Sequence, residues 1–225
     1  EPTPEIFTIS AIGDCTLYND TRYTPATAEF SYASYVGENY AYPFSRTVQY
    51  FENDDLTIAN LECTLSDTKL YSESFFHFLA PAAYANILTE GKVDFVNTAN
   101  NHTDDYGLQG IEETCASLEA VGLPYCKDNE YKVLTTDSGL TVGIYCAYNG
   151  YYPKTENCTA AINAMRDEGA EYIICMFHWG VDEGVYQPTQ YDIDLAHACI
   201  DAGADLIYGS HSHTLQPIEE YKGGI

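Results

Sequence analysis

Short apolar runs that alternate with amphipathic stretches are the feature that most constrains this chain. The apolar runs are typical of buried β-strands, and they lie at residues 7–12, 56–61, 95–98, 141–146, 172–177 and 206–208. Helical periodicity is found at residues 44–51, 82–89, 108–120, 160–167 and 191–202. Glycines 91, 122, 169 and 203 follow four of these helices, as expected for helix ends. The order of elements predicts a layered α/β fold.

Length and charge restrict the possible functions. The 225 residues contain no recognisable linker, so we expect one domain over 1–225, with loops or hairpins at 18–43 and 63–80. The longest apolar run, residues 172–177, is far shorter than the roughly 20 residues of a membrane-spanning helix. A net charge of −25 argues against binding to nucleic acid or anionic lipid. An anionic ligand would need a local positive centre, and a metal ion could supply it. No glycine-rich nucleotide motif is present.

The first residue and the cysteines bear on cellular location. The sequence begins at Glu1, without an initiator Met, which fits a removed export signal as well as a boundary within a longer chain. The acidic, lysine-poor composition favours an extracellular or cell-surface protein, either released or anchored to the membrane by a removed N-terminal segment. Eight cysteines without a CxxC motif allow up to four disulfides or a set of buried free thiols. Cys15 follows Asp14 and Cys63 follows Glu62, so the two thiols are expected to lie near each other if the two acids meet.

Polar side chains follow five of the predicted strands. They are Asp14, Glu62, the Asn101-His102 pair, His178, and the His211-Ser212-His213 segment. In an open α/β sheet, ligands bind outside the carboxyl ends of the strands. Carboxylate, amide and imidazole groups together suit a first-row transition metal better than Ca²⁺ or Mg²⁺. The sequence therefore predicts a metal site.

His211 and His213 give the sharpest local signal. If their segment is extended, the two imidazoles point the same way and can share one ion or serve two; the alternative is a pair of solvated loop histidines. Asp14 could equally be a turn or helix-capping residue, and Glu62 a surface acid.

His102 is followed by Asp104 and Asp105, so a His–Asp pair suited to general acid catalysis is possible. The alternative is a capping cluster for the next helix. His77 and His197 follow no strand, and we interpret both as packing or surface residues.

The motifs, in this order, resemble the CapA family of bacterial proteins linked to poly-γ-glutamate capsule synthesis, which are similar in fold to calcineurin-like metallophosphoesterases. The resemblance runs from residue 7 to the end and rests on the segments Gly13-Asp14, Asn60-Leu61-Glu62, Phe78-Leu79-Ala80-Pro81, Ala99-Asn100-Asn101-His102, Asp105-Tyr106-Gly107, His178-Trp179-Gly180, Ala202-Gly203-Ala204-Asp205, Gly209-Ser210-His211-Ser212-His213 and Gln216-Pro217-Ile218-Glu219.

The resemblance implies a four-layer αββα sandwich with a two-metal edge. Asp14, Glu62 and His213 would hold one metal; Glu62, Asn101, His178 and His211 would hold the other. His102 would protonate the leaving group. The wider superfamily has Asp-x-His at the first motif, whereas this chain has Asp14-Cys15-Thr16, and Glu62 stands where Asp is usual. The family also continues into another strand beyond residue 225, so we expect a final piece to be missing.

The resulting hypothesis is metal-dependent hydrolysis of a phosphoester, with one or two Mn, Fe or Zn ions lowering the pKa of a water toward about 7. His102 and Asp105 would form the acid–base pair. One alternative is a non-catalytic factor that binds the capsule polymer or its synthase, and another is an amide hydrolase acting on poly-γ-glutamate. The expected substrate is an anionic polymer or phosphoester, and the capsule synthase is a candidate protein partner.

Overall fold

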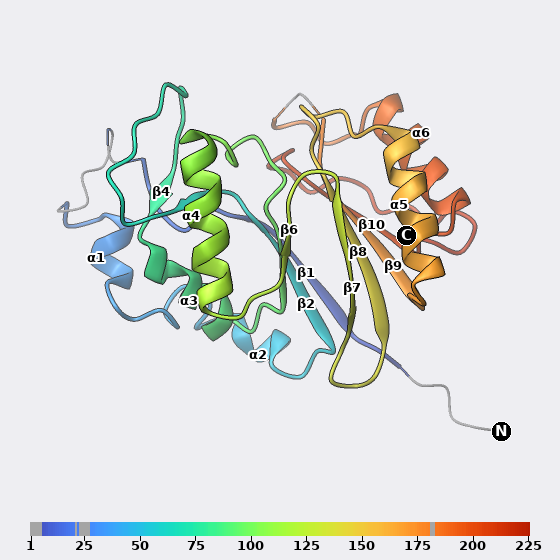
Figure 1. The fold of residues 1–225 in the computed structure, drawn as a ribbon, viewed down its shortest axis with the longest axis horizontal. Coiled ribbons are helices and arrows are strands. Elements are labelled where there is room, and N and C mark those ends of the chain that lie inside the picture. The colour runs from blue at the N-terminus through green and yellow to red at the C-terminus, as the bar shows by residue number, and fades with distance from the viewer. Residues whose placement is uncertain (1–5, 21, 23–27, 181–182) are drawn as a thin grey trace. The chain divides into compact units, whose positions relative to one another are not determined.

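The computed structural model describes residues 6–20, 22, 28–180 and 183–225. It divides the chain into two compact units, one made of residues up to Val96 together with His102–Tyr125, the other of Asn97–Asn101 and Cys126–Ile225 (Figure 1). Each unit has its own hydrophobic core. The sequence shows no linker at these boundaries, because the chain changes unit within short loops and strand ends.

The first unit is built on a sheet with strand order β1-β2-β5-β6. Its strands are β1 (Ile9–Cys15), β2 (Leu56–Leu61), β5 (Phe95–Asn97) and β6 (Tyr125–Cys126). Every residue of β2 is buried, including the polar Thr57 and Asn60. β1 pairs with β2 in parallel, and the register shifts between Ile12 and Asp14.

Helices and one small sheet complete the first unit. The helices are α1 (Tyr32–Val36), α2 (Val48–Phe51), the 3₁₀ turn η1 (Ala82–Tyr84), α3 (Ala85–Glu90) and α4 (Gly107–Ala120). β3 (Thr64–Leu65) pairs in parallel with β4 (Leu79–Ala80). α4 packs on this pair, where the Leu65 N–H donates to Thr114 Oγ1 at 3.0 Å.

The second unit is built on a sheet with strand order β10-β9-β8-β7. Its strands are β7 (Glu130–Thr135), β8 (Thr141–Ala147), β9 (Tyr172–His178) and β10 (Leu206–Ser210). β8, β9 and β10 run parallel, and β7 is an antiparallel edge strand. Helices α5 (Thr155–Asp167) and α6 (Gln190–Asp201) pack on each other and on the sheet. α6 begins with a capping box formed by Thr189 and Asp192.

The predicted α/β class and all eleven predicted elements are confirmed, with differences at their ends. β1 extends through Asp14 and Cys15, so Asp14 belongs to the strand rather than following it. The regions 18–43 and 63–80 contain α1, β3 and β4, and the parallel pairing of β3 with β4 excludes a hairpin there. β7 was not predicted because charged and polar residues interrupt its apolar pattern, as an exposed edge strand allows.

All eight cysteines are free thiols, seven of them buried and Cys115 partly exposed. The structure therefore agrees with the buried-thiol interpretation and not with disulfides. Cys15 and Cys63 do lie near each other: the N–H of Glu62 donates to the Cys15 carbonyl at 3.1 Å, and the nearby Cys15 adds to the burial that raises the pKa of Cys63 to about 12.

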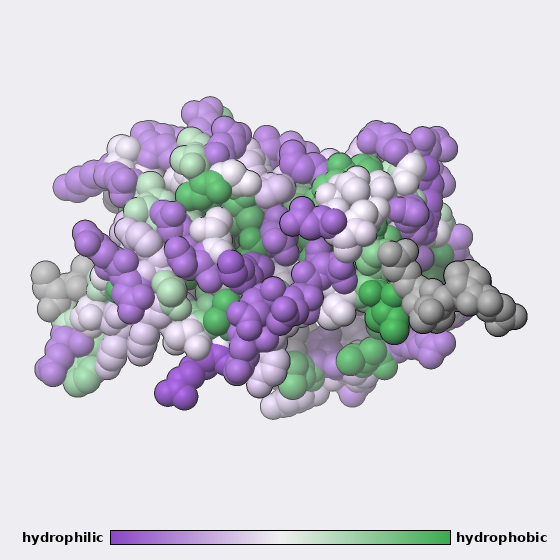
Figure 2. Space-filling model, turned by 90° about the horizontal axis from the view of Figure 1, so that it is seen from below, coloured by the Kyte–Doolittle hydropathy of each residue, from purple (hydrophilic) through white to green (hydrophobic). Residues whose placement is uncertain are grey.

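The surface is largely hydrophilic on the face shown in Figure 2, and hydrophobic residues appear there as separate patches. Among the residues that the structure describes, no helix is both long and apolar enough to cross a membrane.

Candidate metal centre

Two carboxylates of the first unit lie near the carboxyl ends of β1 and β2. The register shift in β1 places Asp14 opposite Asn60 of β2, and Asn60 Nδ2 donates to Asp14 Oδ1 at 2.7 Å. Glu62 follows β2 directly and is 4% exposed, which excludes the surface-acid alternative. Burial, followed by the charges of Asp14 and Glu62, raises the pKa of the Cys15 thiol to about 12. Both carboxylates therefore act electrostatically on the same thiol.

His102 lies in the same unit and pairs with Asp105. Its Nδ1 is 2.8 Å from Asp105 Oδ2, and its Nε2 is 4.0 Å from Glu62 Oε1. Asp105 is buried and also accepts the Phe78 N–H at 3.1 Å, whereas Asp104 is exposed. The N-cap residue of α4 is Tyr106, which makes no side-chain capping bond. The predicted His–Asp pair is thus present, and the capping alternative is not supported.

The second unit contains the imidazoles. His178 ends β9, is fully buried, and has partners on both ring nitrogens: Nε2 lies 2.6 Å from Asn101 Oδ1 and Nδ1 lies 2.9 Å from Ser210 Oγ. The His211 ring is centred 4.8 Å from that of His178. Ser210, which the sequence analysis did not select, orients His178 in the way that an outer-shell partner orients a metal-ligating imidazole.

The His211-Ser212-His213 segment is not extended, which corrects the geometry expected from its sequence. β10 ends at Ser210, and His211 and His213 have φ values of 96° and 54°. The two imidazoles nevertheless lie with their centroids 6.0 Å apart. Positive φ is costly for residues other than glycine and is concentrated at functional sites. The solvated-loop alternative is wrong for His211, which is 3% exposed, whereas the His213 side chain is 50% exposed.

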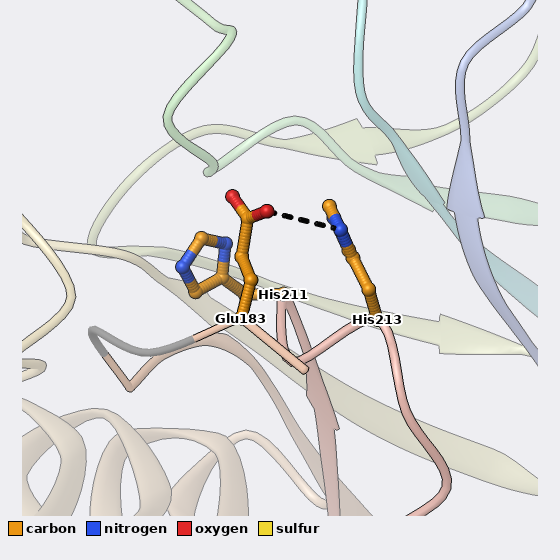
Figure 3. Close-up of side chains that lie close together, drawn as sticks. All are labelled: Glu183, His211 and His213. Carbon is orange, nitrogen blue, oxygen red and sulfur yellow. Dashed lines mark ion pairs between the residues drawn. The ribbon is translucent and has the colours of Figure 1, made fainter. Parts of the chain in front are cut away.

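Glu183 joins this pair, although the sequence analysis did not predict it. Its Oε2 lies 3.4 Å from His213 Nδ1, and one ligand atom each from Glu183, His211 and His213 fall within 4.8 Å of one another. Figure 3 shows the Glu183 carboxylate beside both imidazoles. Glu183 lies five residues beyond the end of β9, in a loop, so the rule that examines residues directly after strands could not find it.

The chemistry of these donors fits a divalent transition metal. The second unit offers an amide oxygen, three imidazoles and a carboxylate, and the first unit offers two carboxylates, which are the groups that Mn, Fe and Zn accept. The division into two metal positions with Glu62 shared between them stays a prediction of the resemblance. His197 is a surface residue stacked on Tyr221 and paired with Glu219, as expected for a histidine outside the site.

A sequence profile described as "Bacterial capsule synthesis protein PGA_cap" matches residues 8–225. The chain belongs to this family. Among its relatives, the PGA biosynthesis protein CapA of Bacillus subtilis is 27% identical over 197 residues, which are 78% of this chain and 52% of that protein. The capsule biosynthesis protein CapA of Bacillus anthracis is 28% identical over 211 residues, covering 82% and 51% of the two chains. A probable polyglutamine synthesis accessory protein of Mycobacterium tuberculosis is 26% identical over 224 residues.

Solved structures support the fold. The calcineurin-like phosphoesterase YfkN of Bacillus subtilis aligns with a TM-score of 0.56 and 18% identity, covering 96% of this chain and 75% of that one. A hypothetical protein of Thermus thermophilus aligns with a TM-score of 0.50 and 18% identity over 76% of this chain and 61% of that one. The fold is therefore that of the calcineurin-like phosphoesterases. The chain spans about half the length of the capsule-synthesis relatives that it matches.

Proposed function

We propose that this chain is a metal-dependent hydrolase of phosphoester type, acting in the synthesis of a poly-γ-glutamate capsule at the cell surface. The observation that carries the proposal is the clustering of Asn101, His178, Glu183, His211 and His213 in the second unit, where three separate segments deliver metal-ligand atoms. Convergence of this kind is how a site is distinguished from solvated side chains.

The proposal assigns roles to the residues of both units. Asp14, Glu62, Asn101, His178, His211 and His213 would hold one or two ions of Mn, Fe or Zn, as the family resemblance implies. When bound, such an ion would lower the pKa of water and neutralise charge on an anionic substrate. Ser210 fixes the orientation of His178 through its Oγ.

His102 has a separate role in this mechanism. Asp105, an acceptor when ionised, holds the proton on His102 Nδ1 and so directs Nε2 toward the side on which Glu62 lies. In the reacting form the ring carries a proton on both nitrogens; Nε2 donates its proton to the leaving oxygen, and His102 is left neutral with its remaining proton on Nδ1. General acid catalysis of this kind contributes roughly 10²- to 10⁴-fold to a rate.

Elemental analysis of the purified protein, followed by thermal unfolding with added metal, tests the assignment. A metal ion at 100 times its dissociation constant stabilises the folded chain by about 2.7 kcal/mol, so Tm should rise by roughly 5–10 °C. His178→Ala should abolish metal uptake and this rise in Tm. The control is His197→Ala, which removes a surface imidazole on the same unit and should leave both unchanged. Equal metal content in His178→Ala and the wild type would refute the assignment.

A non-catalytic function has one observation in its favour. Thr16 occupies the position where the wider superfamily has a metal-binding histidine, so one metal would lose an imidazole ligand. The chain would then bind the capsule polymer or its synthase through the same scaffold. Assays against a panel of phosphoesters and against poly-γ-glutamate separate the possibilities. Metal without turnover favours the binding factor, and turnover of the polymer alone favours an amide hydrolase.

A further inference from the structure

A cavity of about 660 Å³ lies entirely in the first unit and is lined by segments from three regions of the chain. Its volume is in the range of small-molecule sites. The lining residues are Tyr18, Asn19, Arg22, Ser66–Ser72, His77, Leu79, Pro81 and Tyr106.

The charge balance of the cavity differs from that of the chain. Its lining includes Lys69 and Arg22 but a single acid, Asp67, although acids outnumber lysines and arginines by 34 to 9 in the whole sequence. Two acids lie next to the lining: Asp20 pairs with Arg22 at 2.5 Å, and Glu113 accepts a hydrogen bond from Ser66 Oγ. With two cations to three acids among the described residues, an anion near this cavity meets less repulsion than the whole-chain excess of 34 acids over 9 cations would give.

Two of the polar groups that line the cavity, the Lys69 ammonium and the Arg22 guanidinium, are hydrogen-bond donors only. Asp20 and the carbonyl of Phe75 both accept from the Arg22 guanidinium, which fixes the cation at the edge of the cavity. Asp67 already accepts the Ala82 N–H at 3.1 Å. Lys69 is exposed and makes no ion pair with the residues that the structure describes. An ammonium, a guanidinium and neighbouring hydroxyls suit a ligand that carries anionic oxygens.

The cavity shares a wall with the His102–Asp105 pair. His77 and Leu79 line it, and Phe78 between them packs its ring 4.7 Å from that of His102 and donates its N–H to Asp105. Tyr106, which follows Asp105 directly, also lines the cavity, and its ring centroid lies 5.5 Å from that of His77. A ligand in the cavity would thus lie next to the residues that hold His102 in position.

We propose that this cavity binds an anionic oxygen group, carboxylate or phosphate, of the substrate on which His102 acts, and that Lys69 and Arg22 hold it. The link to His102 rests on the proposed function, whereas binding to the cavity does not. A carboxylate and a phosphate both present anionic oxygens, which accept charge-assisted hydrogen bonds from a guanidinium and an ammonium.

Calorimetric titration of the chain in the presence of EDTA tests the cavity without metal or turnover. The probes are glutarate, inorganic phosphate and glutaramide, the last being a neutral analogue of glutarate. At least one of the two anions should bind saturably and glutaramide should not. Saturation by glutarate alone would identify a carboxylate source, and saturation by phosphate alone a phosphate source.

Two variants locate the binding. Lys69→Gln should weaken anion binding by about 5- to 10-fold, the effect of losing a partly screened charged hydrogen bond. Lys92→Gln is the control, because Lys92 is an exposed lysine of the same unit that does not line the cavity and its loss changes the net charge equally. Arg22→Gln should act like Lys69→Gln.

The proposal is overturned if neither anion binds the wild-type chain, if glutaramide binds as well as glutarate, or if Lys69→Gln and Lys92→Gln have the same effect. If anion binding depends on Lys69 but the chain hydrolyses no tested ester or amide, the anion-binding role of the cavity is supported and the proposed hydrolase activity is refuted.

Discussion

Replacing Asp105 with asparagine isolates the contribution of one carboxylate to the chemistry of His102. Asn has nearly the same shape as Asp, and the two hydrogen bonds described for Asp105, from His102 Nδ1 and from the Phe78 N–H, both go to Oδ2. An asparagine that keeps its amide oxygen at this position accepts both. Asp105→Asn therefore removes the negative charge while preserving the contacts.

The structure gives the size of the effect. The 2.8 Å distance from His102 Nδ1 to Asp105 Oδ2 is that of a charge-assisted hydrogen bond, and the exposed fractions of the two side chains are 12% and 2%. A hydrogen bond to a charged group contributes about 1.5–3 kcal/mol. If that stabilisation is realised in the transition state, its loss lowers turnover by about 10- to 150-fold.

The assay is steady-state hydrolysis of whichever compound of the phosphoester panel the wild-type enzyme cleaves. Asp104→Asn is the matched control, since Asp104 is the adjacent acid, is exposed, and makes no described contact with His102. It should retain wild-type turnover. ¹⁵N NMR of the wild-type imidazole provides a second measurement that needs no turnover, and the proton of the neutral ring should be on Nδ1 of His102.

Two results would refute this reasoning. One is equal turnover of Asp105→Asn and Asp104→Asn with unchanged metal content. The other is a neutral His102 that carries its proton on Nε2, because Asp105 would then not be the group that fixes the tautomer.

Three further predictions concern the fold. The Arg166 guanidinium donates to the carbonyls of Ala170, Glu171 and Gly203 and to the Asp205 carboxylate. Arg166→Met should therefore lower the free energy of unfolding by about 2–3 kcal/mol, measured by urea unfolding with the fluorescence of the single tryptophan as the signal. The control, Arg46→Met, replaces an exposed arginine and should change the free energy of unfolding little. Arg22 lowers the pKa of Asp20 to about 2. The pair therefore stabilises the folded chain above about pH 4, and this stabilisation is lost as the pH falls toward 2. The urea midpoint of Asp20→Asn should lack this part of the pH dependence that the wild type shows. Ellman's reagent should modify one thiol, Cys115, in the folded chain and all eight after unfolding, and rapid reaction of several thiols in the folded chain would contradict the described burial.

The sequence could predict the elements because their signals are local. An unbroken apolar run such as residues 172–177 and the glycines after four helices can be recognised without tertiary structure. The strand-end rule likewise selected Asp14, Glu62, His178 and His211 as candidates, and all four lie within one residue of a strand end. Edge strand β7 was not predicted because its partly buried Tyr131 and Val133 alternate with exposed Glu130 and Lys132 and form no continuous apolar run.

The sequence by itself determined the α/β class and the family, and it named most of the candidate donor residues, because hydrophobic periodicity and short motifs are local features of the chain. Tertiary structure alone decided that the chain forms two compact units, that Glu183 joins His211 and His213, and that Lys69, Arg22 and His77 line one cavity. These contacts join residues far apart in sequence through loops, whose paths are set by packing and backbone hydrogen bonds rather than by any local pattern.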